Sequence, residues 1–247
     1  MDNRRDRLRV LLVIEQCNPE LSSVPLEGYQ FYREISRLAD VTLVTHQRNK
    51  RALEKQKDID HSKIFYTNES RFISMYYRLA SIISSKTGGG VNWPLRHALT
   101  YPVYAEFNQK VYQHFKQAIA EKKYDIVHGI TPVIPRYPFK VIKACLKSKI
   151  PFILGPVNGG LPFPPGFSEV AKKENASLNF LRDIGRFVVP GYRETYTKAT
   201  KILAGSTYTL NMLKETFNLP DDRMVLLYEN GVSEDFFYQP RSRKKKR

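Results

Sequence analysis

The sequence predicts an α/β protein built on a mainly parallel β-sheet, and three observations lead to this prediction. Short apolar runs rich in β-branched residues recur along the 247 residues, and segments with a helical spacing of apolar side chains separate them. Hydrophobic residues make up 42% of the chain and charged residues 26%, as in globular proteins that bury a core. Strands that alternate with helices form parallel sheets, and right-handed crossovers then give a doubly wound, Rossmann-like domain.

The apolar runs predict seven strands, which are Leu8–Ile14, Val41–His46, Lys63–Thr67, Asp125–Ile130, Phe152–Gly155, Lys201–Ala204 and Val225–Tyr228. The predicted helices are Gly28–Ala39, about Arg71–Ser85, about Pro102–Lys123, Arg136–Lys147, a region within about Ser177–Thr200, and Thr207–Phe217. The sequence has no internal repeat and no boundary that would divide residues 1–240, so we expect one domain followed by a basic tail at 241–247.

The composition predicts a cytoplasmic protein. Two cysteines, Cys17 and Cys145, are too few for a disulfide framework, which favours a reducing compartment. The apolar run Val10–Ile14 is too short for a signal peptide, and no run approaches the roughly 18 apolar residues of a membrane span. The chain also lacks the paired acidic residues that a phosphate-coordinating metal would need, so we expect neither a metal nor a cofactor.

The net charge of +16 predicts an attraction to polyanions such as nucleic acid, anionic lipid or phosphorylated substrates. The tail Arg241–Arg247 supplies six positive charges as a solvated end, and +10 is spread over the rest of the chain. No nucleic-acid-binding motif accompanies the charge, and aromatic residues are not interleaved with the basic runs, which disfavours nucleic acid as a partner.

Ligands bind parallel sheets at the carboxyl ends of the strands, so the loops after the strands hold the candidate substrate-binding residues. These are Gly28, His128, Asn158, Gly159, Gly160, Ser206, Glu229 and Asn230. No catalytic residue can be assigned from the pattern. The sequence contains neither GxGxxG nor GxxxxGK[ST], which leaves a dinucleotide site or a P-loop unsupported, and GxSxG is absent as well.

Several of these residues also have a plainer structural interpretation. Ser206 has the place of a helix N-cap, although a helix N-terminus also attracts anions. Asn230–Gly231 and Gly159–Gly160 fit simple turns. His128 could be a core histidine bonded to the backbone. For the glycine pair we expect that Gly159 or Gly160 has a positive φ, so that a backbone N–H faces a ligand cleft.

Four motifs, taken in order, resemble the N-terminal half of family 4 glycosyltransferases. They are "YDIVHGITP" (124–132), "PFILGPVNGG" (151–160), "ATKILAGSTYTLNML" (199–213) and "VLLYENGV" (225–232), and the resemblance covers about residues 7–240. That family has the GT-B fold, in which two Rossmann-like domains face each other across a cleft. The resemblance implies the acceptor-binding half of a retaining enzyme that moves a sugar from a nucleotide-sugar to a hydroxyl, without a metal.

The sequence departs from the family pattern at several points. Where many members have a histidine in the cleft, this chain has Val157 and Asn158, and it resembles the subgroup with a Gly-Pro-x-x-Gly-Gly loop. The glycines after the first strand are reduced to Gly28, and Glu229 replaces a proline. The family's donor-binding C-terminal domain has no counterpart in these residues, so we expect the chain to be inactive without it.

The resemblance also gives the positive charge a role, because many such enzymes act on lipid-linked or polysaccharide acceptors of the cell envelope at the inner leaflet. Residues 71–86 place an apolar face opposite a face with Arg71 and Arg78, as in a peripheral membrane helix. The alternative is a helix packed on its own sheet.

Two further functions remain open from the sequence. One is a non-catalytic, basic Rossmann-like module that binds anionic membrane or nucleic acid. The other is a Rossmann-like sensor of a small ligand.

Overall fold

The computed structural model describes residues 7–76, 79, 93–135, 137–159, 166–167, 169, 188–229 and 231. Its centre is a seven-stranded sheet in the order β3-β2-β1-β4-β5-β6-β7, with every neighbouring pair parallel. The strands are β1 (Arg9–Ile14), β2 (Asp40–His46), β3 (Ile64–Thr67), β4 (Ile126–Thr131), β5 (Phe152–Val157), β6 (Lys201–Ala204) and β7 (Met224–Leu226). The predicted doubly wound, Rossmann-like α/β fold is confirmed.

The chain leaves the central strand β1 in one direction and later returns to its other side. It passes from β1 through β2 to the edge strand β3, and then crosses back to β4, which pairs with β1. Leu12 of β1 is therefore opposite Leu43 on one side and His128 on the other. The strand order reverses between β1 and β4, and such a switch point is where open α/β sheets form ligand crevices.

The helices are α1 (Val24–Leu38), α2 (Lys50–Leu53), α4 (Trp93–Ala120), α5 (Ile142–Ser148), α8 (Tyr192–Lys198) and α9 (Thr207–Phe217). Short 3₁₀ turns are η2 (Gln47–Asn49), η3 (His61–Lys63) and η5 (Asp221–Arg223). The prediction for α9 is confirmed to the residue, since Ser206 caps it by accepting a hydrogen bond from the backbone N–H of Thr209 and Asn218 ends it in a left-handed conformation.

Other helix boundaries differ from the prediction for reasons of proline chemistry. Helix α1 begins at Val24 rather than Gly28, because Pro25 fits the first turn of a helix. Helix α5 begins at Ile142 rather than Arg136, since a residue before a proline, here Tyr137 before Pro138, disfavours helical dihedral angles. Helix α4 begins at Trp93, nine residues before the predicted start at Pro102, so this proline lies inside the helix and does not begin it.

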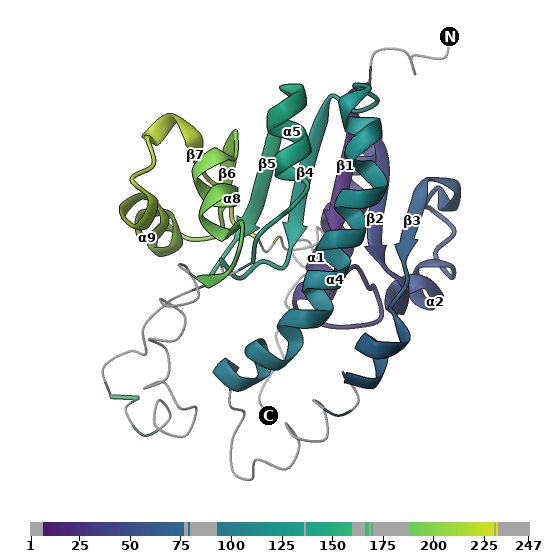
Figure 1. Cartoon of the computed structure of the whole chain (residues 1–247), viewed down its shortest axis with the longest axis horizontal. Helices are drawn as coiled ribbons and strands as arrows, with labels where there is room; N and C mark the ends of the chain where they lie inside the picture. The colour runs from purple at the N-terminus through teal and green to yellow at the C-terminus, as the bar shows by residue number, and fades with distance from the viewer. Residues whose placement is uncertain are drawn as a thin grey trace, which may run out of the picture.

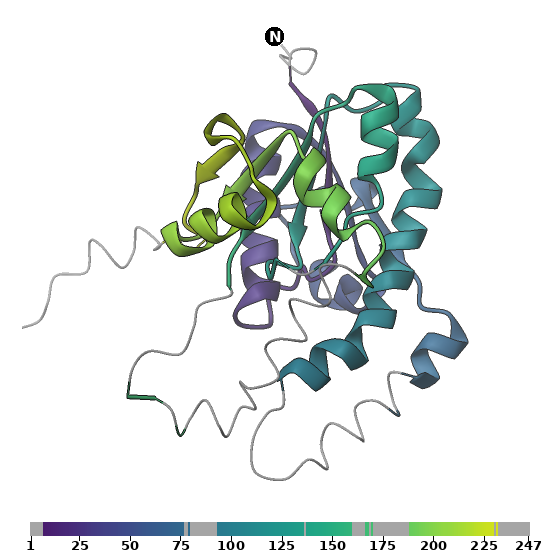
Figure 2. The same ribbon diagram turned by 60° about the vertical axis from the view of Figure 1, so that its left-hand side comes forward.

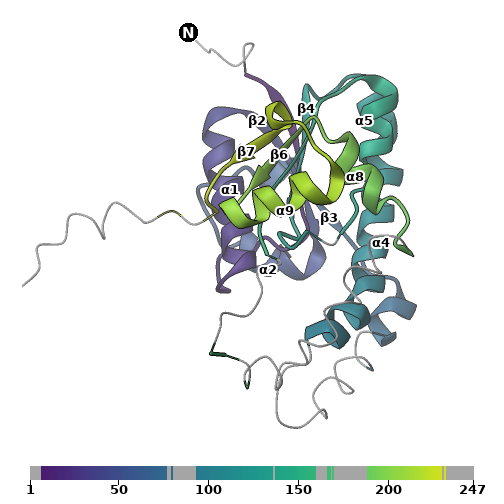
Figure 3. The same cartoon turned by 90° about the vertical axis from the view of Figure 1, so that its left-hand side faces the viewer.

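Alternate side chains of β1 enter two separate cores. Leu11 and Val13 pack in the larger core, with α4, α5 and α8, whereas Leu12 and Ile14 pack in the smaller core, with Tyr29 and Tyr32 of α1. Figure 3 shows α1 on one side of the sheet and α4 with α5 on the other. Each buried aliphatic side chain contributes about 1.5–3 kcal/mol, so both faces of β1 hold the sheet between its helix layers.

The N-terminal part of α4 extends beyond the carboxyl edge of the sheet. The strands point toward this end in Figure 1, and α4 continues past their tips, as does the helical turn at 71–76 that follows β3. Figure 2 shows the same projection after a rotation. These helical turns therefore lie on the side of the sheet where the strand-end loops gather.

Candidate functional site

A cavity of about 500 Å³ lies at the switch point of the sheet. Its lining comes from residues that end or follow β1, β2 and β4, from the start of α1 and from residues of α4. The lining residues are Glu15, Gln16, Asn18, Leu21, Val24, Pro25, His46, Arg48, Asn49, Thr100, Val103, Tyr104, Pro132, Val133, Ile134 and Tyr137. The volume fits a single sugar ring or a ligand of similar size.

Glu15 places a buried carboxylate in this cavity. It follows directly after Ile14, the last residue of β1, and its side chain is only 7% exposed. Burial raises the pKa of Glu15, while the nearby Arg48 charge acts in the opposite direction. The backbone carbonyl of Glu15 accepts a hydrogen bond from Asn49 Nδ2 at 2.8 Å, which ties the end of β1 to the turn after β2.

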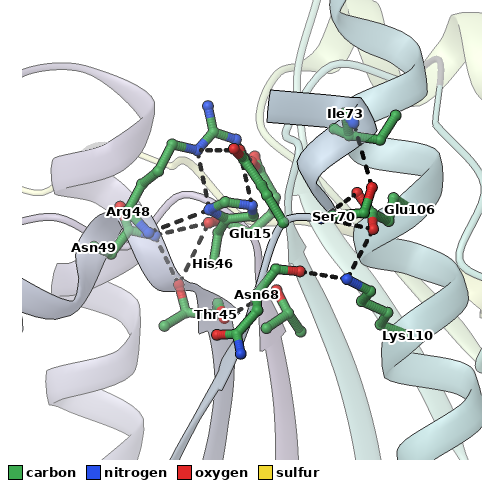
Figure 4. A network of polar contacts seen from close by, with 12 residues as sticks. Glu15, Thr45, His46, Arg48, Asn49, Asn68, Ser70, Ile73, Glu106 and Lys110 are labelled. Carbon is green, nitrogen blue, oxygen red and sulfur yellow. Dashed lines mark hydrogen bonds and ion pairs between the residues drawn. The ribbon is translucent and has the colours of Figure 1, made fainter. Parts of the chain in front are cut away.

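Arg48 joins the ends of three strands (Figure 4). Its Nη2 lies 3.0 Å from Glu15 Oε1, and its Nε lies 3.0 Å from His46 Nδ1 and 3.3 Å from Glu69 Oε1. Glu69 follows β3, so residues after β1, β2 and β3 meet at one guanidinium. Arg48 is still 40% exposed, whereas the carboxylates beside it are nearly buried.

His46 contributes a neutral imidazole to the network. Burial and the charge of Arg48 lower its pKa to about 3, although Glu106 acts in the opposite direction. With Nδ1 accepting from the backbone N–H and Nε–H of Arg48, the remaining proton is on Nε2, which lies 3.2 Å from Glu69 Oε1. That contact is close but poorly aligned as a hydrogen bond, since Glu69 Oε1 has no well-aligned donor among the described residues.

A second ion pair fixes the chain between β3 and α4. Glu106 of α4 accepts a hydrogen bond from the backbone N–H of Ser70 at 3.0 Å and pairs with Lys110 at 2.7 Å. Lys110 also donates to the carbonyl of Asn68 at 2.5 Å (Figure 4). Since Glu69 lies between the two anchored residues, this pair holds its carboxylate next to Arg48 and His46.

The opposite wall of the cavity is aromatic. Tyr104 and Tyr137 both line the cavity and pack edge-on with ring centroids 4.8 Å apart, and Tyr101, which does not line it, stacks on Tyr137 at 6.2 Å. The hydroxyl of Tyr104 donates to the carbonyl of Pro138 at 2.6 Å, which fixes the ring. A cavity with one carboxylate, an arginine and rigid aromatic walls resembles small-molecule sites in which few polar groups orient a ligand.

Asn158, Ser206, Thr209 and Glu229 form a different cluster at the ends of β5, β6 and β7. Asn158 Oδ1 lies 2.9 Å from the backbone N of Gly159 and 3.1 Å from the hydroxyls of Ser206 and Thr209. Asn158 Nδ2 donates to Glu229 Oε1 at 2.6 Å. Of the predicted site residues, the structure therefore brings Asn158, Gly159, Ser206 and Glu229 together, but none of them lines the cavity.

Gly159 has a φ of +132°, so the predicted positive φ is confirmed for the first glycine of the pair. The second part of that prediction is wrong for Gly159 and stays a prediction for Gly160. The N–H of Gly159 does not face a cleft, because it bonds to Asn158 Oδ1 and to Thr209 Oγ1 at 3.2 Å. The turn interpretation fits Gly159 better. Gly160 and Asn230 lie outside the described residues.

His128 and Gly28 have structural roles. His128 is the third residue of β4, is buried, and bonds through Nε2 to the carbonyl of Gly155 at 2.6 Å. Burial lowers its pKa to about 4. A Cβ on Gly28 would lie 2.2 Å from the carbonyl oxygen of Gln16, so glycine lets α1 approach the end of β1. Gly28 thereby positions the loop that lines one side of the cavity.

The residues that line the cavity were not among those predicted from the sequence, although a signal for them exists. Glu15 and His46, which line the cavity, and Glu69, which contacts them through Arg48 but does not line it, each stand at or just after the end of a predicted strand, where all parallel strands share one edge. The prediction relied on glycine-rich loops instead. Within the described ranges, no group of three or more His, Cys, Asp or Glu residues is arranged to hold a metal.

No protein-family model matches the chain, and no curated protein sequence matches it. Helices in the described part of the chain are all too short or too polar to cross a membrane.

Proposed function

We propose that the chain is the acceptor-binding half of a retaining, metal-independent glycosyltransferase of the GT-B type. The observation that carries this proposal is the cavity at the switch point, where a buried carboxylate faces aromatic walls. A sugar ring offers hydroxyl donors to a carboxylate and apolar C–H faces to tyrosine rings. The motif order in the sequence supports the same function, and the nucleotide-sugar would be held mainly by a second domain.

The cavity is tested by sugar binding to the 247-residue chain. Saturation-transfer NMR should detect a hexose, and Ile134→Trp, which places a large side chain in the cavity, should abolish the signal. Leu38→Trp is the matched control, since Leu38 is 79% exposed at the end of α1. Equal signals from both variants would contradict an acceptor site in this cavity.

The donor part of the proposal has its own test. Calorimetry should show weak binding of nucleotide-sugars at most, and the chain alone should not transfer sugar. Submicromolar affinity for one nucleotide-sugar, or turnover, would show that these residues hold the donor themselves.

We also propose that the protein works at an anionic membrane surface. Phe72, Met75 and Leu79 are 69%, 58% and 55% exposed and follow a helical spacing, beside the exposed Arg71. This apolar face is thus not packed on the sheet. Each basic residue near an anionic leaflet contributes about 1 kcal/mol, so several together give reversible binding that salt weakens.

Co-sedimentation with anionic and zwitterionic vesicles tests the membrane proposal. A chain ending at Pro240 removes the basic tail as a cause. Changing both Phe72 and Met75 to Ser should release this truncated chain from anionic vesicles, whereas changing the exposed Leu8 and Leu38 to Ser should not. Binding that survives the first pair of changes would assign the attraction to charge elsewhere, as in the alternative of a non-catalytic basic module.

A further inference from the structure

The lining of the cavity has a polar side and an apolar side, which different elements supply. The polar side comes from residues that end or follow β1 and β2, among them Glu15 and Arg48. The apolar side comes from α4 and from the segment after β4, and it includes Val103, Tyr104, Val133, Ile134 and Tyr137. Because the strand order is β2-β1-β4, the two sides follow one another along the edge of the sheet. A ligand that fills the cavity meets hydrogen-bonding groups on one side and hydrocarbon on the other.

The charges on the polar side cancel. Among the described residues, the charged ones in the lining are Glu15 and Arg48, and Arg48 Nη2 lies 3.0 Å from Glu15 Oε1. His46 is uncharged at neutral pH, because burial lowers its pKa to about 3. Asn49 uses its amide nitrogen within the protein, where it donates to the carbonyl of Glu15 and to Thr45 Oγ1, each at 2.8 Å. A ligand thus finds no net charge to pair with, so ionic attraction is not the main source of affinity.

The apolar side is a wall of nearly buried hydrocarbon in a fixed shape. Val103 and Val133 are 4% and 7% exposed, although both line the cavity. The hydroxyl of Tyr104 donates to the carbonyl of Pro138, and its ring packs edge-on against Tyr137, which joins α4 to the segment after β4. A ligand hydroxyl placed against the two valines would give up a hydrogen bond to water and gain none from them, which is unfavourable. An apolar group placed there would instead release water from hydrocarbon surface, which is favourable.

We propose that the cavity binds an amphipathic acceptor, a sugar that carries an aromatic ring or a hydrocarbon group of similar size. Its hydroxyls would meet the polar side, and its apolar substituent would cover the wall formed by Val103, Tyr104, Val133, Ile134 and Tyr137. A volume of about 500 Å³ lies within the range of pockets that enclose drug-sized ligands, so the cavity has room for both groups. This inference rests on the proposed acceptor function and adds the chemical class of the acceptor.

Two matched glycosides test the apolar substituent. Methyl β-D-glucoside and phenyl β-D-glucoside offer the same hydroxyls and differ in the substituent alone. NMR titration of the 247-residue chain should give phenyl β-D-glucoside an about tenfold lower dissociation constant, because its ring buries apolar surface against the wall. Ile134→Trp should remove the binding of both glycosides, whereas Leu38→Trp, at an exposed position, should not. Equal dissociation constants, or a phenyl preference that survives Ile134→Trp, would overturn the inference.

A change of chemistry in the wall tests the contact itself. Val133→Thr keeps the branched shape of the side chain but adds a hydroxyl, so it should reduce the phenyl-to-methyl preference by about threefold. Val225→Thr is the control, since Val225 is 41% exposed on β7, and it should leave the preference unchanged. If Val133→Thr does not fold, the wild-type protein decides through intermolecular nuclear Overhauser effects. Phenyl protons should show such effects to the methyl groups of Val103 and Val133, and their absence at saturation would contradict the proposal.

The acceptor function and the amphipathic class can fail separately. If both glucosides bind with equal affinity, the cavity still holds a sugar and only the amphipathic class is wrong. If neither glucoside binds but benzyl alcohol shows nuclear Overhauser effects to Val103 and Val133, the apolar wall stands as a binding site and the proposed acceptor function fails.

Discussion

The two halves of the sheet's carboxyl edge differ in what their polar groups are used for. After β1, β2 and β4, polar side chains surround a cavity of about 500 Å³ and include a buried carboxylate. After β5, β6 and β7, the polar groups of Asn158, Ser206 and Thr209 bond mainly to one another. The first half leaves a space beside its polar groups, whereas the second uses its polar groups to hold its own loops in place. Polar residues at strand ends therefore do not identify a site unless a space remains beside them.

Lowering the pH should cause the largest loss of stability, and the two histidines responsible, His46 in β2 and His128 in β4, belong to the cavity half. The unfolded chain protonates histidine near pH 6.5, but burial holds the pKa of His46 at about 3 and that of His128 at about 4. Both groups stabilise the fold above pH 6.5, and this stability is lost as the pH falls toward the folded values. At about 1.4 kcal/mol per unit, the loss approaches about 5 kcal/mol for His46 and about 3.5 kcal/mol for His128.

Urea unfolding between pH 7.5 and 4 measures this loss. His46→Gln and His128→Gln should each flatten the fall in stability, with the larger change for His46→Gln. His61→Gln is the control, since His61 is exposed. Parallel curves for all three variants and the wild type would show that neither buried histidine causes the acid sensitivity.

A side chain at Gly28 should damage the cavity half by about 3 kcal/mol, the upper range for overpacking. A Cβ there meets the carbonyl oxygen of Gln16 at 2.2 Å and Ile14 Cγ2 at 2.8 Å. Thermal unfolding of Gly28→Val measures the loss. Gly231→Val is the control, because no heavy atom lies within 4 Å of its Cβ position. Similar melting temperatures for both would refute the close approach of α1 to β1.

Removing the Asn158 side chain should cost about 2–3 kcal/mol, since several hydrogen bonds of about 1 kcal/mol each are lost at once. Asn158→Ala should lower stability while leaving hexose binding in the cavity unchanged at temperatures where the protein is folded. Asn158→Asp keeps the acceptor oxygen but places a second carboxylate 2.6 Å from Glu229 Oε1. It should therefore recover little of the stability that Asn158→Ala loses. Loss of sugar binding in folded Asn158→Ala would join the two halves into one site.

The smallest effect is expected at Gly159. Its φ of +132° is rarely adopted by residues with a Cβ, so Gly159→Ala should cost about 1–2 kcal/mol. The nearest atom, Pro135 Cδ, lies 3.6 Å from the added Cβ, so no clash contributes. Comparing the free energies of unfolding of Gly159→Ala and Gly231→Ala by chemical denaturation isolates the cost of the backbone conformation at Gly159. A cost near zero would mean that the turn relaxes to a negative φ.

The sequence by itself determined the layers and the order of the elements. Seven apolar runs separated by helical segments leave few alternatives to a parallel sheet, because both faces of each strand must be buried. Ser206 and Asn218 likewise fixed both ends of α9. These features depend on periodicity and local capping chemistry, which neighbouring residues encode.

Only the tertiary structure decided where the cavity lies and which charges face it. The strand order places the ends of β1, β2 and β3 side by side, so that Arg48 meets Glu15 and Glu69, residues 33 and 21 positions away. The same packing buries His128 and uses the N–H of Gly159 inside the protein. A residue's chemistry is written in the sequence, but its burial and its partners depend on long-range contacts that local patterns do not specify.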